Sequence, residues 1–168
     1  MATGAYCNVV VSGSEPVLIV ILKSSVSNFT SLVPDLATNL IKFLQSQGHI
    51  VAAVSGGFVD VIEPLMSEIG IANYHANKLE IIDGKLTGKI IGAIVDSKTK
   101  CETLVKFANQ FKIPMTETVA IGDGANDLDM MQIAGISIAF NAKPIVEAAA
   151  DYSIKEPSLR SVAALIGL

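Results

Sequence analysis

An apolar run that breaks into a short turn with two aspartates constrains this chain most. The run from Thr118 to Ile121 predicts a buried parallel strand, and the Gly-Asp-Gly turn that follows leads toward a helix. Asp123 and Asp127 would then gather at the carboxyl end of a strand, where open α/β sheets bind their ligands. Paired carboxylates beside a helix N-terminus suit Mg²⁺ together with a phosphate. The alternative is an ordinary loop in which Asp127 only occupies a first helical turn.

Strand and helix patterns alternate along the rest of the chain, which predicts an α/β fold: a doubly wound, Rossmann-like parallel sheet. We expect a single domain over 1–168, with 1–16 as an N-terminal extension and 17–168 as the core. The wholly apolar run Val17–Leu22 should lie at the centre of a five-stranded parallel core, between residues 50–54 and 118–121. Asp83-Gly84 predicts a small β-hairpin within 74–91. Further strands are expected at 6–12 and 136–140, and helices at 34–47, 59–69, 97–111, 145–150 and 158–166.

Composition narrows the class of protein. Apolar residues make up 51% of the chain and the mean hydropathy is +0.53, which suits a parallel sheet buried on both faces or an apolar surface covered by a partner. A net charge of −4 without a basic cluster argues against nucleic-acid binding, and the broken apolar runs argue against a membrane span.

The cysteines and histidines do not predict a metal site. Cys7 and Cys101 lack metal-ligand spacing, as do His49 and His75. Without a signal-peptide pattern, we expect a reducing cytoplasm or organelle matrix rather than secretion; removal of a transit peptide stays open.

Several segments together resemble one enzyme family. They are Val54-Ser55-Gly56-Gly57-Phe58, residues 73–92, Val95-Asp96 with Lys100, the Asp123 turn, and residues 139–144. In this order and spacing, from about residue 34 to 153, the chain is similar to the haloacid dehalogenase (HAD) superfamily, and within it to phosphoserine phosphatases.

The resemblance implies roles for individual residues. Phosphate would be bound by Ser55, Gly56, Gly57, Lys100 and Asn126, and Mg²⁺ by Asp123 and Asp127. Each also has a structural alternative. Ser55 would otherwise cap a helix, Lys100 would be a solvated surface residue, and Asn126 would stabilise a turn.

The family's first motif does not match. It is an apolar strand that ends in Asp-x-Asp-x-Thr, whose first Asp attacks phosphorus and whose second is the general acid/base. Aligned by the end of the 17–22 strand, Ile21, Lys23 and Ser25 stand at those positions, and no Asp or Glu occurs from Pro16 to Pro34. Isoleucine has no lone pair, which excludes covalent catalysis by this route. Only residues 26–54 separate Ser25 from Ser55, so no helical cap is expected over the site.

These departures predict a pseudophosphatase: an inactive phosphoserine phosphatase-like protein that binds other protein subunits in a larger assembly, with Mg²⁺ weak or absent. Lys23 would replace the metal as a fixed cation near Asp123 or Asp127. One alternative is an active Mg²⁺-dependent phosphoserine phosphatase, with the first motif elsewhere or a carboxylate from a partner chain. The other is a protein that binds a phosphorylated metabolite without hydrolysing it.

Overall fold

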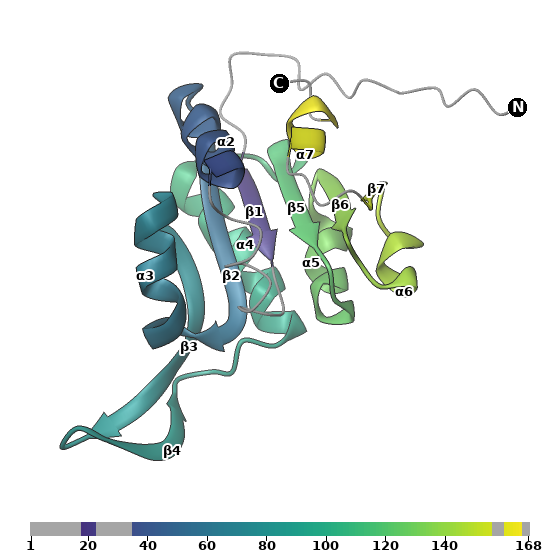
Figure 1. Ribbon diagram of the computed structural model, residues 1–168. Coiled ribbons are helices and arrows are strands. Elements are labelled where there is room, and N and C mark those ends of the chain that lie inside the picture. The colour runs from purple at the N-terminus through teal and green to yellow at the C-terminus, as the bar shows by residue number, and fades with distance from the viewer. Residues whose placement is uncertain (1–17, 23–34, 156–159, 166–168) are drawn as a thin grey trace, which may run out of the picture.

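A seven-stranded sheet forms the centre of the molecule (Figure 1). The structure is a computed structural model that describes residues 18–22, 35–155 and 160–165. The strand order is β4-β3-β2-β1-β5-β6-β7, and all pairs are parallel except β3 with β4. The strands are β1 (Leu18–Leu22), β2 (Ile50–Phe58), β3 (Asn73–Ile82), β4 (Lys85–Ile91), β5 (Thr118–Gly122), β6 (Ile136–Phe140) and β7 (Tyr152–Ile154).

Helices cover both faces of this sheet. They are α2 (Asp35–Ser46), α3 (Val59–Ile69), α4 (Ser97–Phe111), α5 (Leu128–Ile133), α6 (Pro144–Glu147) and α7 (Arg160–Leu165), with short 3-10 helices η1 (Met115–Glu117) and η2 (Ala125–Asp127). Apolar side chains of α2, α3 and α7 share one core cluster with Ile19 of β1, and those of α4, α5 and α6 share another with Leu18 and Val20. Successive side chains of β1 therefore point to opposite faces of the sheet and pack into two cores, as a doubly wound sheet requires.

The central position of the apolar strand is confirmed. β1 pairs with β2 on one side and β5 on the other, with Leu18 opposite both Ile50 and Thr118. The predicted five-stranded core is too small, because β3 and the short β7 also pair in parallel. The first half of β3 joins β2 and its second half joins β4, so a segment predicted only as a hairpin also extends the main sheet.

The predicted hairpin is confirmed over the second half of β3 and β4, which project beyond the body of the sheet (Figure 1). Asp83 and Gly84 connect the strands with φ values of 50° and 72°. Two successive positive values are what a two-residue hairpin turn requires. The expected helices at 59–69 and 97–111 match α3 and α4. Among the described residues between β1 and β2, α2 is the only helix, and the expected strand at 6–12 lies outside the described residues.

Two histidines should make the stability of the fold depend on pH. Burial lowers the pKa of His49, and burial together with the charge of Lys106 lowers the pKa of His75. The folded state therefore favours neutral imidazoles. The contribution of the two neutral imidazoles to stability is fully present above the ordinary histidine pKa of about 6.5 and is lost as the pH falls through the lowered pKa values of the folded state. We expect the free energy of unfolding in urea to be smaller at about pH 5.5 than at about pH 7.5.

The double variant His49→Asn/His75→Asn is the control for this prediction. It should lose most of the difference between the two pH values, since carboxylates are still largely ionised over this interval. Equal unfolding free energies for the unaltered protein at both values would contradict the expectation.

Candidate active site

The candidate site lies at the carboxyl ends of β2 and β5, on either side of β1. Val54 of β2 is in register with Leu22, and Ile121 of β5 with Ile21. The residues that follow them, Ser55 and the turn containing Asp123, therefore meet just beyond the end of β1. This edge of a parallel sheet is where α/β proteins place their ligands.

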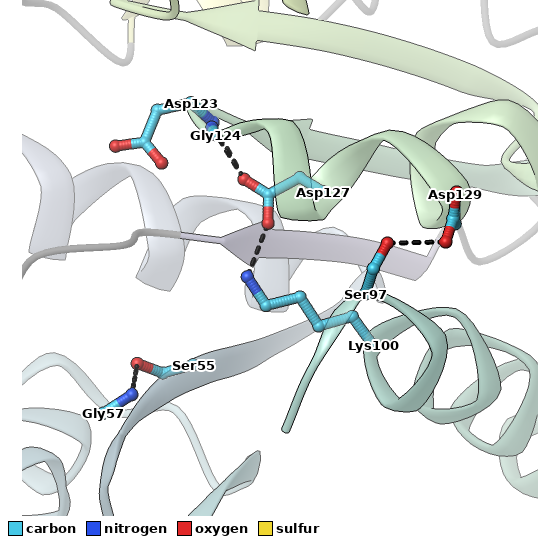
Figure 2. A network of polar contacts seen from close by, with 8 residues as sticks. All are labelled: Ser55, Gly57, Ser97, Lys100, Asp123, Gly124, Asp127 and Asp129. Carbon is cyan, nitrogen blue, oxygen red and sulfur yellow. Dashed lines mark hydrogen bonds and ion pairs between the residues drawn. The ribbon is translucent and has the colours of Figure 1, made fainter. Parts of the chain in front are cut away.

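A buried ion pair anchors the site (Figure 2). The Nζ of Lys100, on the first turn of α4, lies 2.6 Å from Oδ1 of Asp127, and both side chains are 0% exposed. The other carboxylate oxygen, Oδ2, accepts hydrogen bonds from the backbone N–H groups of Asp123 at 3.1 Å and Gly124 at 3.0 Å. A buried charge of either sign needs such partners, and here each has them. The alternative of a solvated Lys100 is wrong.

Glycine at position 122 permits this arrangement. A Cβ on Gly122 would lie 2.7 Å from Cβ of Asp127 and 3.0 Å from Sδ of Met131. The backbone of β5 can therefore approach the Asp127 side chain closely only without a side chain of its own. The backbone of Asp123 is held on both sides, because its N–H donates to Asp127 and its carbonyl accepts from the N–H of Lys143 at 3.2 Å.

The structure gives different surroundings to the two aspartates that the sequence predicts as metal ligands. Figure 2 shows the Asp123 carboxylate turned away from Asp127, whose own oxygens are occupied by Lys100 and the turn amides. Asp127 is thus paired with Lys100, and the roles of Asp123 and Asp127 as metal ligands stay predictions. Residues 18–22, 35–155 and 160–165 contain no group of three His, Cys, Asp or Glu side chains arranged to hold a metal. Mg²⁺ commonly uses one or two carboxylates with waters and phosphate oxygens, so Asp123 fits that role.

Ser55 belongs to the end of β2 rather than to a helix cap. The N-cap position of α3 is Phe58, which makes no side-chain cap hydrogen bond. The hydroxyl oxygen of Ser55 accepts a hydrogen bond from the N–H of Gly57 at 3.0 Å. That bond leaves the hydroxyl proton available for an acceptor such as a phosphate oxygen. The Gly57 amide, in contrast, is already engaged, so the expected phosphate contact from this amide is not preformed.

The remaining predicted site residues are placed as follows. Ile21 lies within β1, with its backbone in register with Ala53 and Ile121. Lys23 and Ser25 lie outside the described residues, so the predicted role of Lys23 as a fixed cation stays a prediction. Asn126 is exposed on η2, and its contact with phosphate also stays a prediction.

Sequence reasoning missed two polar contacts near the site. Ser97 Oγ donates to Oδ2 of Asp129 at 2.6 Å and joins the start of α4 to α5 (Figure 2). The nearly buried Asn77 links β2 to the segment before α4. Neither pairing has a signal in the sequence, because the partners are 18 to 32 positions apart.

Comparisons with known proteins agree with this geometry. The family model described as haloacid dehalogenase-like hydrolase matches residues 21–132, more than half of the chain. The chain belongs to this family. A phosphoserine phosphatase of Streptomyces coelicolor is 47% identical over 132 residues, which are 79% of this chain and 32% of the relative. One of Streptococcus thermophilus is 48% identical over 126 residues, which are 75% of this chain and 59% of the relative. The chain thus spans about a third to three fifths of these HAD relatives.

Solved structures show the same likeness. The unliganded probable phosphoserine phosphatase from Vibrio cholerae superposes with a TM-score of 0.81 at 27% identity, over 91% of this chain and 64% of that one. A structure described as a phospho-aspartyl intermediate analogue of phosphoserine phosphatase gives a TM-score of 0.79 at 28% identity, over 90% of this chain and 99% of that one.

These findings correct the predicted function. Phosphoserine phosphatases 42–48% identical to the chain favour an active enzyme, so the prediction of an inactive pseudophosphatase is wrong. Nothing supports the predicted protein subunits of a larger assembly, whereas a small phosphorylated substrate fits the family. Weak or absent Mg²⁺ binding stays a prediction.

In the part of the chain that the structure describes, no helix has both the length and the apolar character to cross a membrane.

Proposed function

We propose that this HAD chain takes part in the Mg²⁺-dependent hydrolysis of a phosphate monoester, with phosphoserine as the substrate. The buried Lys100–Asp127 pair carries the proposal, because it holds a positive charge at the ligand-binding edge of the sheet. The similarity to phosphoserine phosphatases over three quarters of the chain supports the choice of substrate.

In this proposal, each described residue has a defined task. Lys100 stabilises charge on the phosphate oxygens, since a buried cation held in place by Asp127 needs no reorganisation during the reaction. Ser55 donates its hydroxyl proton to a phosphate oxygen. Asp123 would hold Mg²⁺, which when bound neutralises phosphate charge and orients the substrate.

The group that attacks phosphorus would be a carboxylate that neither β1 nor the residues directly after it supply. The related structure described as a phospho-aspartyl intermediate analogue supports an aspartate in that role. Because residues 16–34 contain no Asp or Glu, the carboxylate must reach the end of β1 from another part of the protein or from a second chain. Acid-quenching the reaction and locating the acyl phosphate by mass spectrometry would identify it.

Phosphate release from phosphoserine tests the proposal. We expect turnover with Mg²⁺, loss of turnover with a chelator, and a fall of about 100-fold or more in Asp123→Asn, since a catalytic metal is worth several kcal/mol of charge stabilisation. Asp129→Asn is the matched control, because that carboxylate bonds to Ser97 instead of facing the ligand edge. Phosphoserine binding without any phosphate release would contradict hydrolysis and favour the non-hydrolytic binding protein.

A further inference from the structure

The end of β2 that carries Ser55 departs from regular sheet pairing. Ser55 is in register with Ala76 of β3, but the next paired residue of β2 is Phe58, which is in register with Asn77. Gly56 and Gly57 therefore have no opposite residues in β3 and form a bulge. Bulges re-aim side chains, and their unpaired backbone groups need other partners.

The side chain of Asn77 supplies one of those partners. Its Nδ2 donates to the carbonyl of Gly56 at 2.8 Å, and its Oδ1 accepts from the N–H of Val95 at 2.8 Å. Asn77 is only 5% exposed; its contact with Val95 is buried and its contact with Gly56 is partly buried. A buried amide whose donor and acceptor are both satisfied fixes the separation of the two segments that it joins.

Those two segments adjoin Ser55 and lead to Lys100, the two residues proposed to bind phosphate. Gly56 adjoins Ser55, and Val95 adjoins Asp96, the N-cap residue of α4. The Asp96 side chain accepts from the N–H of Thr99 at 2.8 Å, and its carbonyl accepts from the N–H of Lys100 at 3.0 Å. A short chain of contacts therefore runs from Ser55 through Asn77 to Lys100.

We propose that Asn77 is a positioning residue that sets the Ser55 hydroxyl and the Lys100 ammonium at the spacing of a single phosphate group. This role rests on the proposed phosphatase function. It requires asparagine, because the contact with Gly56 needs a donor and the contact with Val95 needs an acceptor on the same planar group. Aspartate has the same shape and keeps the acceptor, but sets a carboxylate oxygen against the Gly56 carbonyl. Leucine has neither function.

Thr118 provides a matched control for a purely structural role. Its side chain is also buried, donates to the carbonyl of Met115 at 2.7 Å and accepts from the N–H of Gly135 at 3.1 Å. It thus joins η1 to the residue before β6 through one donor and one acceptor, as Asn77 joins its two segments, but at the first residue of β5 instead of the ligand edge. Thr118→Val should lower stability without altering phosphate binding.

The test compares Asn77→Asp, Asn77→Leu and Thr118→Val with the unaltered protein. We expect the affinity of both Asn77 variants for inorganic phosphate, measured by titration calorimetry with Mg²⁺ present, to fall by a factor of about ten or more. The affinity of Thr118→Val should stay within about twofold of that of the unaltered protein. The Val95 amide should exchange with solvent faster in Asn77→Leu than in Asn77→Asp, which keeps its acceptor. If Asn77→Leu does not fold, the isosteric Asn77→Asp carries the test.

Unchanged phosphate affinity in a folded Asn77 variant would overturn the positioning role, as would an equal loss in Thr118→Val. Failure of the proposed reaction gives a different result. An unaltered protein that binds phosphate without hydrolysing phosphoserine overturns the phosphatase function, whereas the affinity ratio between the variants still decides the role of Asn77.

Discussion

Replacing Lys100 with methionine should lower the free energy of unfolding by about 3–5 kcal/mol, because it leaves the buried Asp127 carboxylate without its cation. The methionine side chain is similar in length to that of lysine, so the loss of stability measures the removal of the charge rather than the creation of a cavity. Two backbone N–H groups still bond to Asp127, but they do not replace a full positive charge. Urea denaturation at neutral pH measures the loss, and titration with inorganic phosphate should show that binding is weakened as well.

Two further variants make this prediction specific. Lys98→Met removes a lysine from the same helix whose partner Glu102 lies 3.7 Å away with both side chains well exposed, so little change is expected. The double variant Lys100→Met/Asp127→Asn should recover part of the lost stability, because it removes the unpaired charge. A loss below about 1 kcal/mol in Lys100→Met would show that water reaches the pair.

Replacing Gly135 with alanine should cost more than about 3 kcal/mol or prevent folding. A Cβ at this position would lie 2.1 Å from the carbonyl oxygen of Thr116 and 2.5 Å from its carbonyl carbon. These are backbone atoms, which cannot rotate away as a side chain can. The adjoining Thr118 hydroxyl fixes the same approach through its bond with the Gly135 N–H. Denaturant unfolding, or the yield of folded protein, measures the effect.

Gly84→Ala is the control for Gly135→Ala. Gly84 has a φ of 72° and nothing within 4 Å of a Cβ, so only the backbone strain of about 1–2 kcal/mol applies. Equal losses in the two variants would show that contact with Thr116 is not what requires glycine at 135.

Much of the fold could be predicted from local pattern. The uninterrupted apolar run predicted the central strand, and the helices expected at 59–69 and 97–111 match the bounds of α3 and α4. β7 was not predicted because three residues are too few to show a period. The parallel pairing of β3 was hidden by a stronger hairpin signal in the same segment, since one strand contacts two different neighbours along its length.

The site was predictable as a set of residues, but not as a set of contacts. Asp123, Asp127 and Lys100 were all expected at one edge, but the pairing of Asp127 with Lys100 was not predicted. The Asp127 side chain is fixed by the Gly122–Gly124 turn, which directs two backbone amides at one of its carboxylate oxygens. Asn77 was missed because its partners depend on a bulge in another strand, and no spacing within its own segment signals that bulge.

The position of β1 also has a consequence for how the protein is made. Leu18 pairs with Ile50 on one side, but its partner on the other side, Thr118, comes 118 − 18 = 100 positions later in the chain. At a synthesis rate of about 5–20 residues per second, one edge of the central strand has no native neighbour for roughly 5–20 s. Unpaired apolar edges join other chains readily. Co-produced chaperones that shield this edge during synthesis should therefore raise the yield of soluble protein.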